Sequence, residues 1–371
     1  MKYYIIAGEA SGDLHGSNLI KGLKKADPDA AIRCWGGDLM EAAGGTLVKH
    51  YKEQSFMGFF EVIMNLNKIF SNIKLCKKDI AAYKPDVIIF IDYSGFNLRI
   101  AKWAKPLGYR TFYYISPQVW ASRESRMKAI KRDIDEIFVI LPFEKDFYEK
   151  KHNFPVNFVG HPLLDAISEK PAVDPEFFRK EFKLDDRPVI ALLPGSRKQE
   201  ITNMLEVMIN ITPEFTKEYQ FVIAGAPSQD FAFYEQFLKD TPIAFVNNRT
   251  YDLLNISTAA LVTSGTATLE TALLKVPEVV CYKGNWISYQ IAKRIITLKF
   301  ISLVNLIMDR EVVKELIQDE FNEKNLKNEL RKILDPKVRE RIFADYYELE
   351  QRLGGKGASE AAAKLIFEKI S

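Results

Sequence analysis

Two strand-to-helix turns in the second half of the chain carry groups that suit a nucleotide diphosphate. In LVTSGTATLETALL, Ser264-Gly265-Thr266 ends an expected strand, and Glu270 lies one helical turn after Thr266 on the same face. Glycine lets a phosphate approach the backbone, the hydroxyls can cap or donate, and a carboxylate can accept both hydroxyls of a ribose. In VIALLPGSRKQEI, Arg197 starts an expected helix, whose N-terminus attracts anions. An ordinary capped helix with a charged surface residue has the same pattern.

An acidic residue in the first half suits proton abstraction. In DVIIFIDYSGFNLRIAK, Asp92 ends a run that is typical of a buried strand, and Asn97 follows on the next turn. A carboxyl group at such a place is unfavourable unless it is paired or used. In a doubly wound sheet it faces the crevice beyond the strand ends, where a general base would deprotonate an acceptor hydroxyl. A helix-capping aspartate is the structural alternative.

The turn AGEASGDLHG, residues 7–16, joins an expected first strand to an expected first helix and is rich in polar residues. Its glycine spacing is not G-x-G-x-x-G, and Gly12 is followed by Asp13 instead of the lysine of a P-loop. The position at a strand end favours a ligand site. Glycines that only permit a tight turn are the alternative.

Composition excludes several classes of protein. The chain has 371 residues, of which 47% are hydrophobic and 27% charged, which is typical of a globular protein with two domains. A net charge of +3 is too small to indicate nucleic-acid binding. The three cysteines lie far apart and the four histidines show no HxxxH spacing, so we expect a reducing compartment and no metal site. We expect neither a signal peptide nor a membrane span, and therefore a cytosolic protein that can still touch a membrane surface.

Strand-like and helical stretches alternate along the chain and predict the α/β class. Short apolar runs such as KYYIIAG, DVIIFID and RTFYYIS are typical of parallel strands that are buried on both faces. Residues 168–178 contain two prolines and mixed charge and indicate a linker, after which VIALLPGS, QFVIAGA and AALVTSG repeat the scheme. We predict two doubly wound Rossmann-like domains, residues 1–167 and 168–347, facing a cleft. A helical tail, residues 348–371, is expected to cross back to the first domain.

Residues 55–78 are more apolar than one buried helix face requires. Apolar side chains with a lysine-rich end suit a helix in a membrane interface or an acyl groove. A core helix of the first domain is the alternative. The residues assigned to membrane or acyl contact are Phe56, Met57, Phe59, Phe60, Ile63 and Lys74.

A basic stretch follows the run YYIS. These cations can face an anionic lipid or a phosphate, or they can form an ordinary solvated surface. They are Arg123, Arg126, Lys128, Lys131 and Arg132. The acidic pair Asp133 and Asp135 precedes a strand instead of following one, so we do not interpret it as the metal site of a glycosyltransferase.

Taken together, these motifs resemble the lipid-A-disaccharide synthase family, which are inverting glycosyltransferases of the two-domain GT-B type. The match runs nearly from end to end, and the joint occurrence of the motifs in order makes it specific. The family-like stretches are GEASGD (8–13), MGFFEV (57–62), DYSGFN (92–97), SPQVWA (116–121), LPFE (141–144), FVGHP (158–162), LLPGSR (192–197), SGTATLE (264–270) and SLVN (302–305).

The resemblance implies a reaction in lipid A biosynthesis. UDP-2,3-diacylglucosamine would give its sugar to the 6-hydroxyl of 2,3-diacylglucosamine 1-phosphate, with inversion and release of UDP. The resemblance implies no cofactor, no metal and no nucleic-acid partner, and it leaves a homodimer open. It also implies a cytoplasmic enzyme that is peripheral on the inner membrane of a Gram-negative bacterium.

The resemblance also implies roles for single residues. Asp92 is expected to be the catalytic base, and Asp13 is the rival candidate. The first domain is expected to bind substrate through Ser11, Gly12 and Asn97. The second domain is expected to bind UDP through Arg197, Ser264, Gly265, Thr266, Glu270 and Asn305.

Three positions depart from the family pattern. Ser94 and Val304 stand where prolines are expected, and Ser122 replaces a tryptophan. The polar residues are retained, so these departures concern acceptor or acyl preference and not the reaction type. The rival functions are another UDP-sugar enzyme, such as a UDP-N-acetylglucosamine 2-epimerase, and a membrane-surface protein that binds nucleotide-sugars without turnover. Dependence of activity on lipid or detergent would distinguish the lipid A enzyme from the first rival. Binding of UDP and lipid without formation of a product would indicate the second rival.

Overall fold

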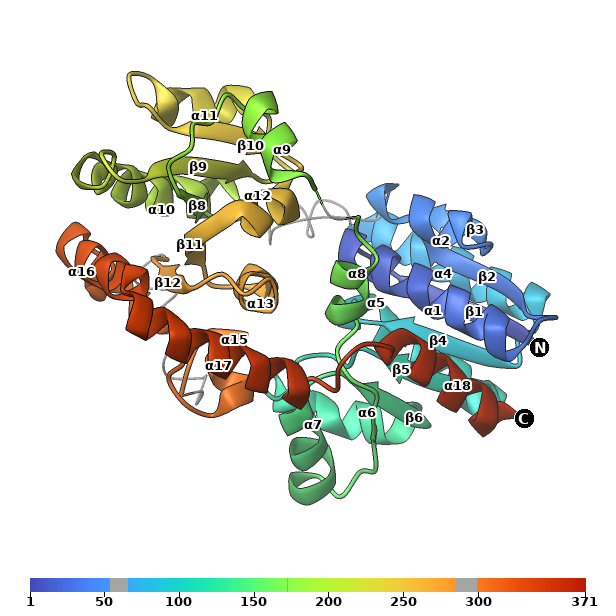
Figure 1. Ribbon diagram of the computed structural model, residues 1–371. Coiled ribbons are helices and arrows are strands. Elements are labelled where there is room, and N and C mark those ends of the chain that lie inside the picture. The colour runs from blue at the N-terminus through green and yellow to red at the C-terminus, as the bar shows by residue number, and fades with distance from the viewer. Residues whose placement is uncertain (54–65, 172, 285–298) are drawn as a thin grey trace. The chain divides into compact units, whose positions relative to one another are not determined.

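The computed structural model describes residues 1–53, 66–171, 173–284 and 299–371. They form two compact units, each a parallel sheet with helices around it (Figure 1). Unit 1 contains Met1–Glu169 together with Leu353–Ser371, and unit 2 contains Lys170–Arg352. The chain therefore crosses between the units twice.

Unit 1 is built on a seven-stranded parallel sheet with the order β3-β2-β1-β4-β5-β6-β7. The order reverses at β1, which pairs with both β2 and β4, so the crevice beyond the strand ends lies between the loops after β1 and β4. The strands are β1 (Lys2–Ala7), β2 (Ala31–Gly36), β3 (Thr46–His50), β4 (Val87–Ile91), β5 (Arg110–Tyr114), β6 (Glu136–Val139) and β7 (Asn157–Phe158).

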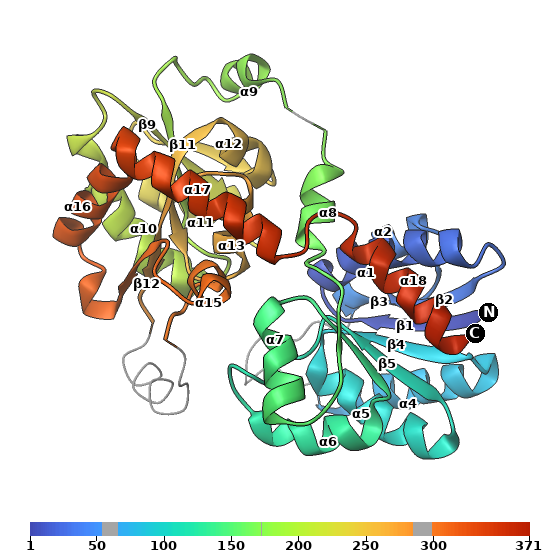
Figure 2. The same cartoon turned by 60° about the horizontal axis from the view of Figure 1, so that its bottom comes forward.

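Side-chain alternation along these strands covers both faces of the sheet. Tyr4, Ile6, Ile88 and Phe90 pack with the helices α4, α5 and α6 on one face, whereas α1 and α18 lie on the other (Figure 2). The helices of unit 1 are α1 (Ala10–Ala26), α2 (Asp38–Ala42), α4 (Leu66–Tyr83), α5 (Ser94–Ala104), α6 (Met127–Asp133), α7 (Pro142–Asp146), α8 (Leu163–Ser168) and α18 (Ala358–Ile370).

The C-terminal helix α18 belongs to unit 1 because it packs closely on α1. Gly22 in α1 has no side chain, and a Cβ atom there would lie 2.8 Å from the Cβ atom of Ala363. Where the chain returns, the His161 amide donates to the Leu353 carbonyl at 3.0 Å. The Asp165 carboxylate accepts from the Gly357 and Ser359 amides at 2.6 and 2.9 Å, which caps the start of α18.

Unit 2 repeats the scheme with a six-stranded parallel sheet of order β10-β9-β8-β11-β12-β13. Here the order reverses at β8, which pairs with β9 and β11. The strands are β8 (Val189–Leu193), β9 (Gln220–Gly225), β10 (Ala244–Asn247), β11 (Ser257–Thr263), β12 (Glu278–Tyr282) and β13 (Lys314–Ile317). The helices are α9 (Pro175–Glu181), α10 (Lys198–Asn210), α11 (Phe231–Leu238), α12 (Thr250–Ile256), α13 (Thr266–Leu273), α15 (Leu303–Met308), α16 (Glu323–Leu334) and α17 (Pro336–Arg352).

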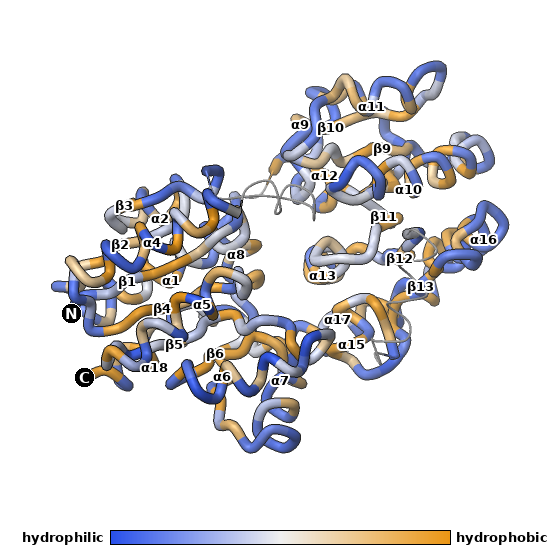
Figure 3. The backbone as a smooth tube through the Cα atoms, turned by 180° about the vertical axis from the view of Figure 1, so that it is seen from behind, coloured by the Kyte–Doolittle hydropathy of each residue, from blue (hydrophilic) through white to orange (hydrophobic). Residues whose placement is uncertain are grey.

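The apolar strands form the core of each unit. Strands β4 and β8 are buried along their whole length. In Figure 3, hydrophobic stretches mark the central strands β1 and β4 of unit 1. Buried parallel strands need continuous apolar runs because helices cover both faces. The prediction of two doubly wound Rossmann-like α/β domains is confirmed in the fold of the two units.

Candidate functional site

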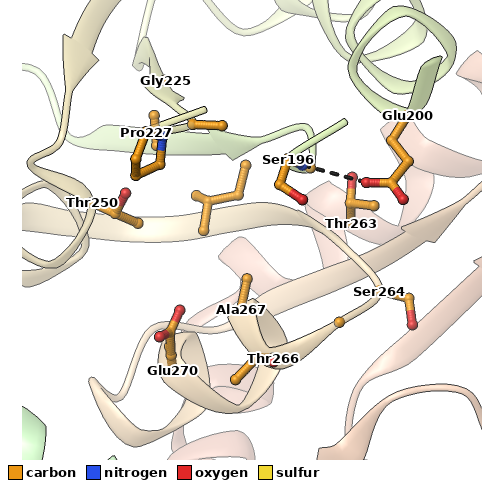
Figure 4. Close-up of a pocket in the computed structure, with 15 residues that line it drawn as sticks. Ser196, Glu200, Gly225, Pro227, Thr250, Thr263, Ser264, Thr266, Ala267 and Glu270 are labelled. Carbon is orange, nitrogen blue, oxygen red and sulfur yellow. Dashed lines mark hydrogen bonds between the residues drawn. The ribbon is translucent and has the colours of Figure 1, made fainter. Parts of the chain in front are cut away.

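Unit 2 contains a pocket of about 300 Å³ at the carboxyl ends of its central strands (Figure 4). It lies beside the order reversal at β8 and β11, where ligands bind in open α/β sheets. The loops after β8, β9 and β11 and the start of α13 supply its walls. Of the residues predicted for the donor, Ser264, Gly265, Thr266 and Glu270 line this pocket together.

The turn before α13 presents backbone and hydroxyl groups to the pocket. A Cβ atom on Gly265 would have no neighbour within 4 Å, so the turn leaves space next to its backbone. Thr266 begins α13, whose first N–H groups have no acceptor within the helix. The Ser264 side chain is held in place by a hydrogen bond, because its hydroxyl donates to the Ile301 carbonyl at 3.2 Å. This arrangement suits an anionic oxygen.

Glu270 is the acidic group of the pocket and is held by a neighbour. The Tyr251 hydroxyl donates to Oε1 of Glu270 at 2.7 Å, which fixes the carboxylate. Burial raises the pKa of Glu270, and this hydrogen bond counteracts part of the increase. The ammonium group of Lys170 lies 3.8 Å from the Tyr251 ring centroid. The sequence did not reveal the role of Tyr251, because this residue lies in α12, before strand β11, whereas Glu270 lies in α13, after that strand.

Arg197 lies at the start of α10 but is not a wall residue of the pocket. Its side chain is 76% exposed, and its guanidinium lies 3.7 Å from the carboxylate of Glu200. Glu200 also accepts from the Ser196 and Arg197 amides at 3.4 and 3.3 Å, so a carboxylate occupies the helix start (Figure 4). Gly195 has φ +107°, which favours glycine in this turn.

Asn305 is not brought into the pocket. Its side chain is fully buried, donates to the Val313 carbonyl and to Glu315, and accepts from the Val312 and Val313 amides. Glu315 in turn accepts from the Ile301 amide at 2.9 Å. Asn305 therefore holds the segment whose Ile301 carbonyl binds the Ser264 hydroxyl, which is a positioning role.

In unit 1, Asp92 directly follows β4 at the order reversal of the sheet. Asp92 and Tyr93 have φ values of 40° and 45°, and Ile115, directly after the neighbouring β5, has φ 59°. Left-handed backbone is uncommon for residues other than glycine and unfavourable for a β-branched one. Such strain persists where the surroundings fix it and concentrates at functional sites.

The carboxyl group of Asp92 titrates above its usual range. Desolvation and, to a smaller extent, the negative charge of Glu9 together raise its pKa to about 6. Glu9 precedes α1 and comes near because β1 and β4 are neighbours. A carboxylate with a pKa of this size can accept a proton near neutral pH.

Asn97 fixes the backbone at Asp92 through hydrogen bonds. Its side chain is fully buried, and its Nδ2 donates to the backbone carbonyl of Asp92 at 2.8 Å and to that of Ile91 at 3.2 Å. The Tyr113 hydroxyl donates to the same Asp92 carbonyl. Asn97 is therefore placed as a positioning residue, and Tyr113 is a second one that sequence reasoning missed.

The segment AGEASGDLHG is a turn only at residues 8–9, because α1 already begins at Ala10, and its polar residues are partly buried and partly exposed. The buried Asp13 carboxylate accepts from the amides of Gly37, Leu39 and Met40 at 2.8, 3.2 and 3.0 Å, so it caps α2. Gly12 is buried, and a Cβ atom there would lie 3.0 Å from that of Ala7, which explains the close approach of α1 to β1. Ser11 is exposed.

The loop between β5 and α6 is organised by Glu144, whose role the sequence did not reveal. This buried carboxylate accepts from the Ser116 hydroxyl at 2.7 Å and from the Trp120 indole at 3.2 Å. It also accepts from the Ile140 and Leu141 amides. Burial raises the pKa of Glu144, and these donors counteract the increase. The SPQVWA and LPFE motifs thus form one structural unit.

Most of the residues assigned to membrane contact lie outside the described part of the chain, namely Phe56, Met57, Phe59, Phe60 and Ile63. Lys74 is exposed on α4, where Phe70 and Leu75 are also exposed. Within the described ranges, no helix has the length and apolar character needed to cross a membrane. In those same ranges no cluster of three His, Cys, Asp or Glu side chains could hold a metal ion.

Comparison with known families and relatives covers the whole chain. The model of the family described as lipid-A-disaccharide synthetase matches residues 3–369. The lipid-A-disaccharide synthase of Syntrophus aciditrophicus is 39% identical over 99% of this chain and 97% of its own length. The enzyme of the same name from Geobacter metallireducens is 38% identical over 99% of this chain and 96% of its own length.

A solved structure with much lower identity shares the fold. The UDP-GlcNAc 2-epimerase of Neisseria meningitidis, bound to UDP-GlcNAc, aligns with a TM-score of 0.71 over 99% of this chain and 100% of that one. Its sequence is 13% identical. This likeness shows the two-domain architecture and carries no argument about the reaction.

Proposed function

The chain belongs to the lipid-A-disaccharide synthase family, and from this we propose that it condenses UDP-2,3-diacylglucosamine with 2,3-diacylglucosamine 1-phosphate. The products are the β-1,6-linked disaccharide 1-phosphate of lipid A biosynthesis and UDP. The observation that carries the proposal is the identity of 35–39% to lipid-A-disaccharide synthases along 99% of the chain. The pocket of unit 2 and the raised pKa of Asp92 support the proposal, because the reaction needs a donor-binding site and a base.

Unit 2 is the proposed donor side. The turn Ser264-Gly265-Thr266 and the first N–H groups of α13 bind the diphosphate, and Glu270 accepts the ribose hydroxyls. Arg197 has an exposed side chain and directly follows Ser196, which lines this pocket. Its guanidinium is the proposed cationic partner of the diphosphate. Fixed dipoles and the arginine charge then stabilise the leaving UDP.

Asp92 is the proposed base. Its carboxylate removes the proton of the acceptor 6-hydroxyl, the oxygen forms a bond to C1 of the donor sugar, and the bond from C1 to the UDP oxygen breaks. Attack opposite the leaving group inverts the configuration at C1. We prefer Asp92 over Asp13 because three backbone amides already occupy the Asp13 carboxylate. Because Asp13 is also buried, its carboxylate has little access to substrate.

We also propose peripheral attachment to the cytoplasmic face of the inner membrane. The apolar segment of residues 55–73 and the exposed Phe70, Leu75 and Lys74 of α4 support this. Apolar side chains flanked by lysines suit an anionic membrane interface. We therefore assign this patch to the membrane and not to a second copy of the chain.

UDP release is the direct test. Purified protein in detergent with EDTA should release UDP from UDP-2,3-diacylglucosamine only when the acceptor is present, with one disaccharide formed per UDP. Asp92→Asn should lower turnover by about 10²- to 10⁴-fold, the range for a general base, with UDP affinity unchanged. Asp13→Asn, which keeps one acceptor oxygen, serves as the matched carboxylate control and should retain turnover.

Other outcomes identify the rival functions. Release of UDP without acceptor would point to a hydrolase or an epimerase-like enzyme. If the protein binds UDP but releases none from UDP-2,3-diacylglucosamine under any condition, the result would favour a non-catalytic protein that binds nucleotide-sugars. Full activity in Asp92→Asn with loss in Asp13→Asn would move the base to Asp13.

A further inference from the structure

Two arginines lie next to the Asp92 edge of unit 1. Nη1 of Arg126 donates to Oγ of Ser94 at 2.7 Å, and Ser94 is the first residue of α5, two positions after Asp92. Arg126 is half-buried, whereas Arg123 is exposed and has φ 62°. The Ser94 hydroxyl therefore anchors Arg126 at the first turn of α5.

The acidic residue that lies nearest to this pair in the sequence is paired with other cations. Glu124, which lies between the two arginines in sequence, pairs with Lys151 and His152 at 2.9 Å. In the described part of the chain, no carboxylate lies within ion-pair distance of Arg123 or Arg126. Partial burial and the positive charge of Arg123 lower the pKa of Arg126. A half-buried cation next to a like charge is unfavourable unless an anion joins it.

The first turn of α5 adds donors on the same side. This helix has eleven residues and begins with Ser94 and Gly95, and a Cβ atom on Gly95 would have no neighbour within 4 Å. Because the Ser94 oxygen accepts from Arg126, its own O–H remains able to donate. A forked guanidinium, a hydroxyl and free helix N–H groups together match an anion with several oxygens, such as a phosphate monoester.

We propose that Arg126, Arg123 and the first turn of α5 bind the phosphate monoester of the acceptor sugar. The inference rests on the proposed function and names the part of the site that selects the acceptor. The donor carries a diphosphate that unit 2 can bind, whereas the acceptor carries a single phosphate at C1. Binding that phosphate two residues from Asp92 would place the sugar so that its 6-hydroxyl reaches the base.

The test compares two acceptors that differ only in this group, 2,3-diacylglucosamine 1-phosphate and 2,3-diacylglucosamine, in micelles of a neutral detergent. Arg126→Met should lower kcat/KM for the phosphorylated acceptor by roughly 10- to 100-fold, the range for hydrogen bonds to a charged group. The loss should appear mainly in KM, and activity with the dephosphorylated acceptor should be unchanged. Ser94→Ala should show a smaller loss with the same selectivity.

The matched control is Lys128→Met, which removes an exposed cation two residues further along. This substitution should leave kcat/KM unchanged for both acceptors. Arg126→Lys should recover part of the loss, because it restores charge without the forked geometry. Thermal unfolding of each variant identifies misfolded protein, in which case Ser94→Ala and Arg123→Met carry the test.

Three results would overturn the inference. An equal loss with both acceptors would mean that Arg126 only supports Asp92 through Ser94. An equal loss in Lys128→Met would indicate general electrostatic attraction. A loss of sedimentation with phosphatidylglycerol vesicles and no change in acceptor discrimination would assign the arginines to membrane headgroups. Failure of the proposed function looks different, because the unmodified protein would then form no disaccharide from either acceptor.

Discussion

At Asp92, a left-handed backbone and a raised pKa occur in the same residue. The backbone is held by Asn97 and Tyr113 through the Asp92 carbonyl, so the direction of the carboxyl group is fixed before substrate binds. The raised pKa has a separate cause, which is desolvation together with the charge of Glu9. Position and basicity can therefore be changed independently by mutation.

The pKa of Asp92 predicts an acid limit on activity. A base must be deprotonated, so kcat/KM should be constant well above pH 6, fall to about half near pH 6 and decrease about tenfold per pH unit below it. Glu9→Gln removes a negative charge that raises this pKa and should move the acid limit to lower pH. Initial rates between pH 4.5 and 8 check both statements. An acid limit that stays in place in Glu9→Gln would contradict the assignment of this pKa to Asp92.

Among the elements, helices α12 and α13 are linked through a single hydrogen bond at the pocket. Tyr251 in α12 donates to Glu270 in α13, and the two residues lie on opposite sides of β11 in the sequence. Since Tyr251 also contacts Lys170, the first residue of unit 2, the orientation of Glu270 depends on the segment that enters this unit.

Tyr251→Phe should weaken UDP binding while the fold remains intact. The ring and its contacts are kept, so only the hydrogen bond to Glu270 is lost, which corresponds to about 1 kcal/mol or roughly fivefold in Kd. Tyr347→Phe is the matched control, because Tyr347 is exposed in the same unit. Calorimetric titration with UDP measures both. Equal affinities of Tyr251→Phe and the unmodified protein would show that this bond does not orient a ribose ligand.

The strands and turns that form the candidate sites could be predicted from the sequence, whereas several side-chain contacts within these sites could not. Apolar runs that end in Asp92 and in Ser264-Gly265-Thr266 indicate buried parallel strands, and parallel strands place their carboxyl ends at one edge. The pattern cannot show which way a side chain turns. Asn305 looked like a ligand residue, yet it turns inward to Glu315 and the backbone near β13.

Contacts between distant motifs were also beyond sequence reasoning. Asp13 caps α2, which begins 25 residues later. Glu144 in α7 accepts hydrogen bonds from Ser116 and Trp120, which lie in the loop between β5 and α6. The residues in these contacts are of common polar or aromatic types, and no sequence spacing predicts that they meet in the fold. The apolar residues Phe56 to Ile63 lie outside the described ranges, so their assignment stays a prediction.

On the scale of the whole molecule, α18 completes unit 1 by covering α1. The fit depends on Gly22, because a methyl group there would lie 2.8 Å from the Cβ atom of Ala363 and 3.2 Å from the Ser359 carbonyl oxygen. Helices can approach this closely only where one of them lacks a side chain. The contact joins residues at opposite ends of the sequence.

Gly22→Ala should therefore destabilise the protein even though alanine favours helix. The overpacked contact should lower the free energy of unfolding by about 1–3 kcal/mol, despite the gain in helix propensity. Gly95→Ala is the matched control, since a methyl group in α5 meets nothing within 4 Å and should cause no loss. Urea unfolding followed by circular dichroism measures both. Equal midpoints for the two variants would show that α18 adapts to α1 without cost.

The double crossing of the chain has a consequence for how this protein is made. A ribosome releases the sequence from its N-terminus, so the strands and α1 of unit 1 emerge first and unit 2 emerges next as one continuous stretch. The segment Leu353–Ser371, which covers α1, is synthesised only after the whole of unit 2. Unit 2 can thus fold before α18 is available to unit 1, so unit 1 begins to be translated before unit 2 but is completed after it.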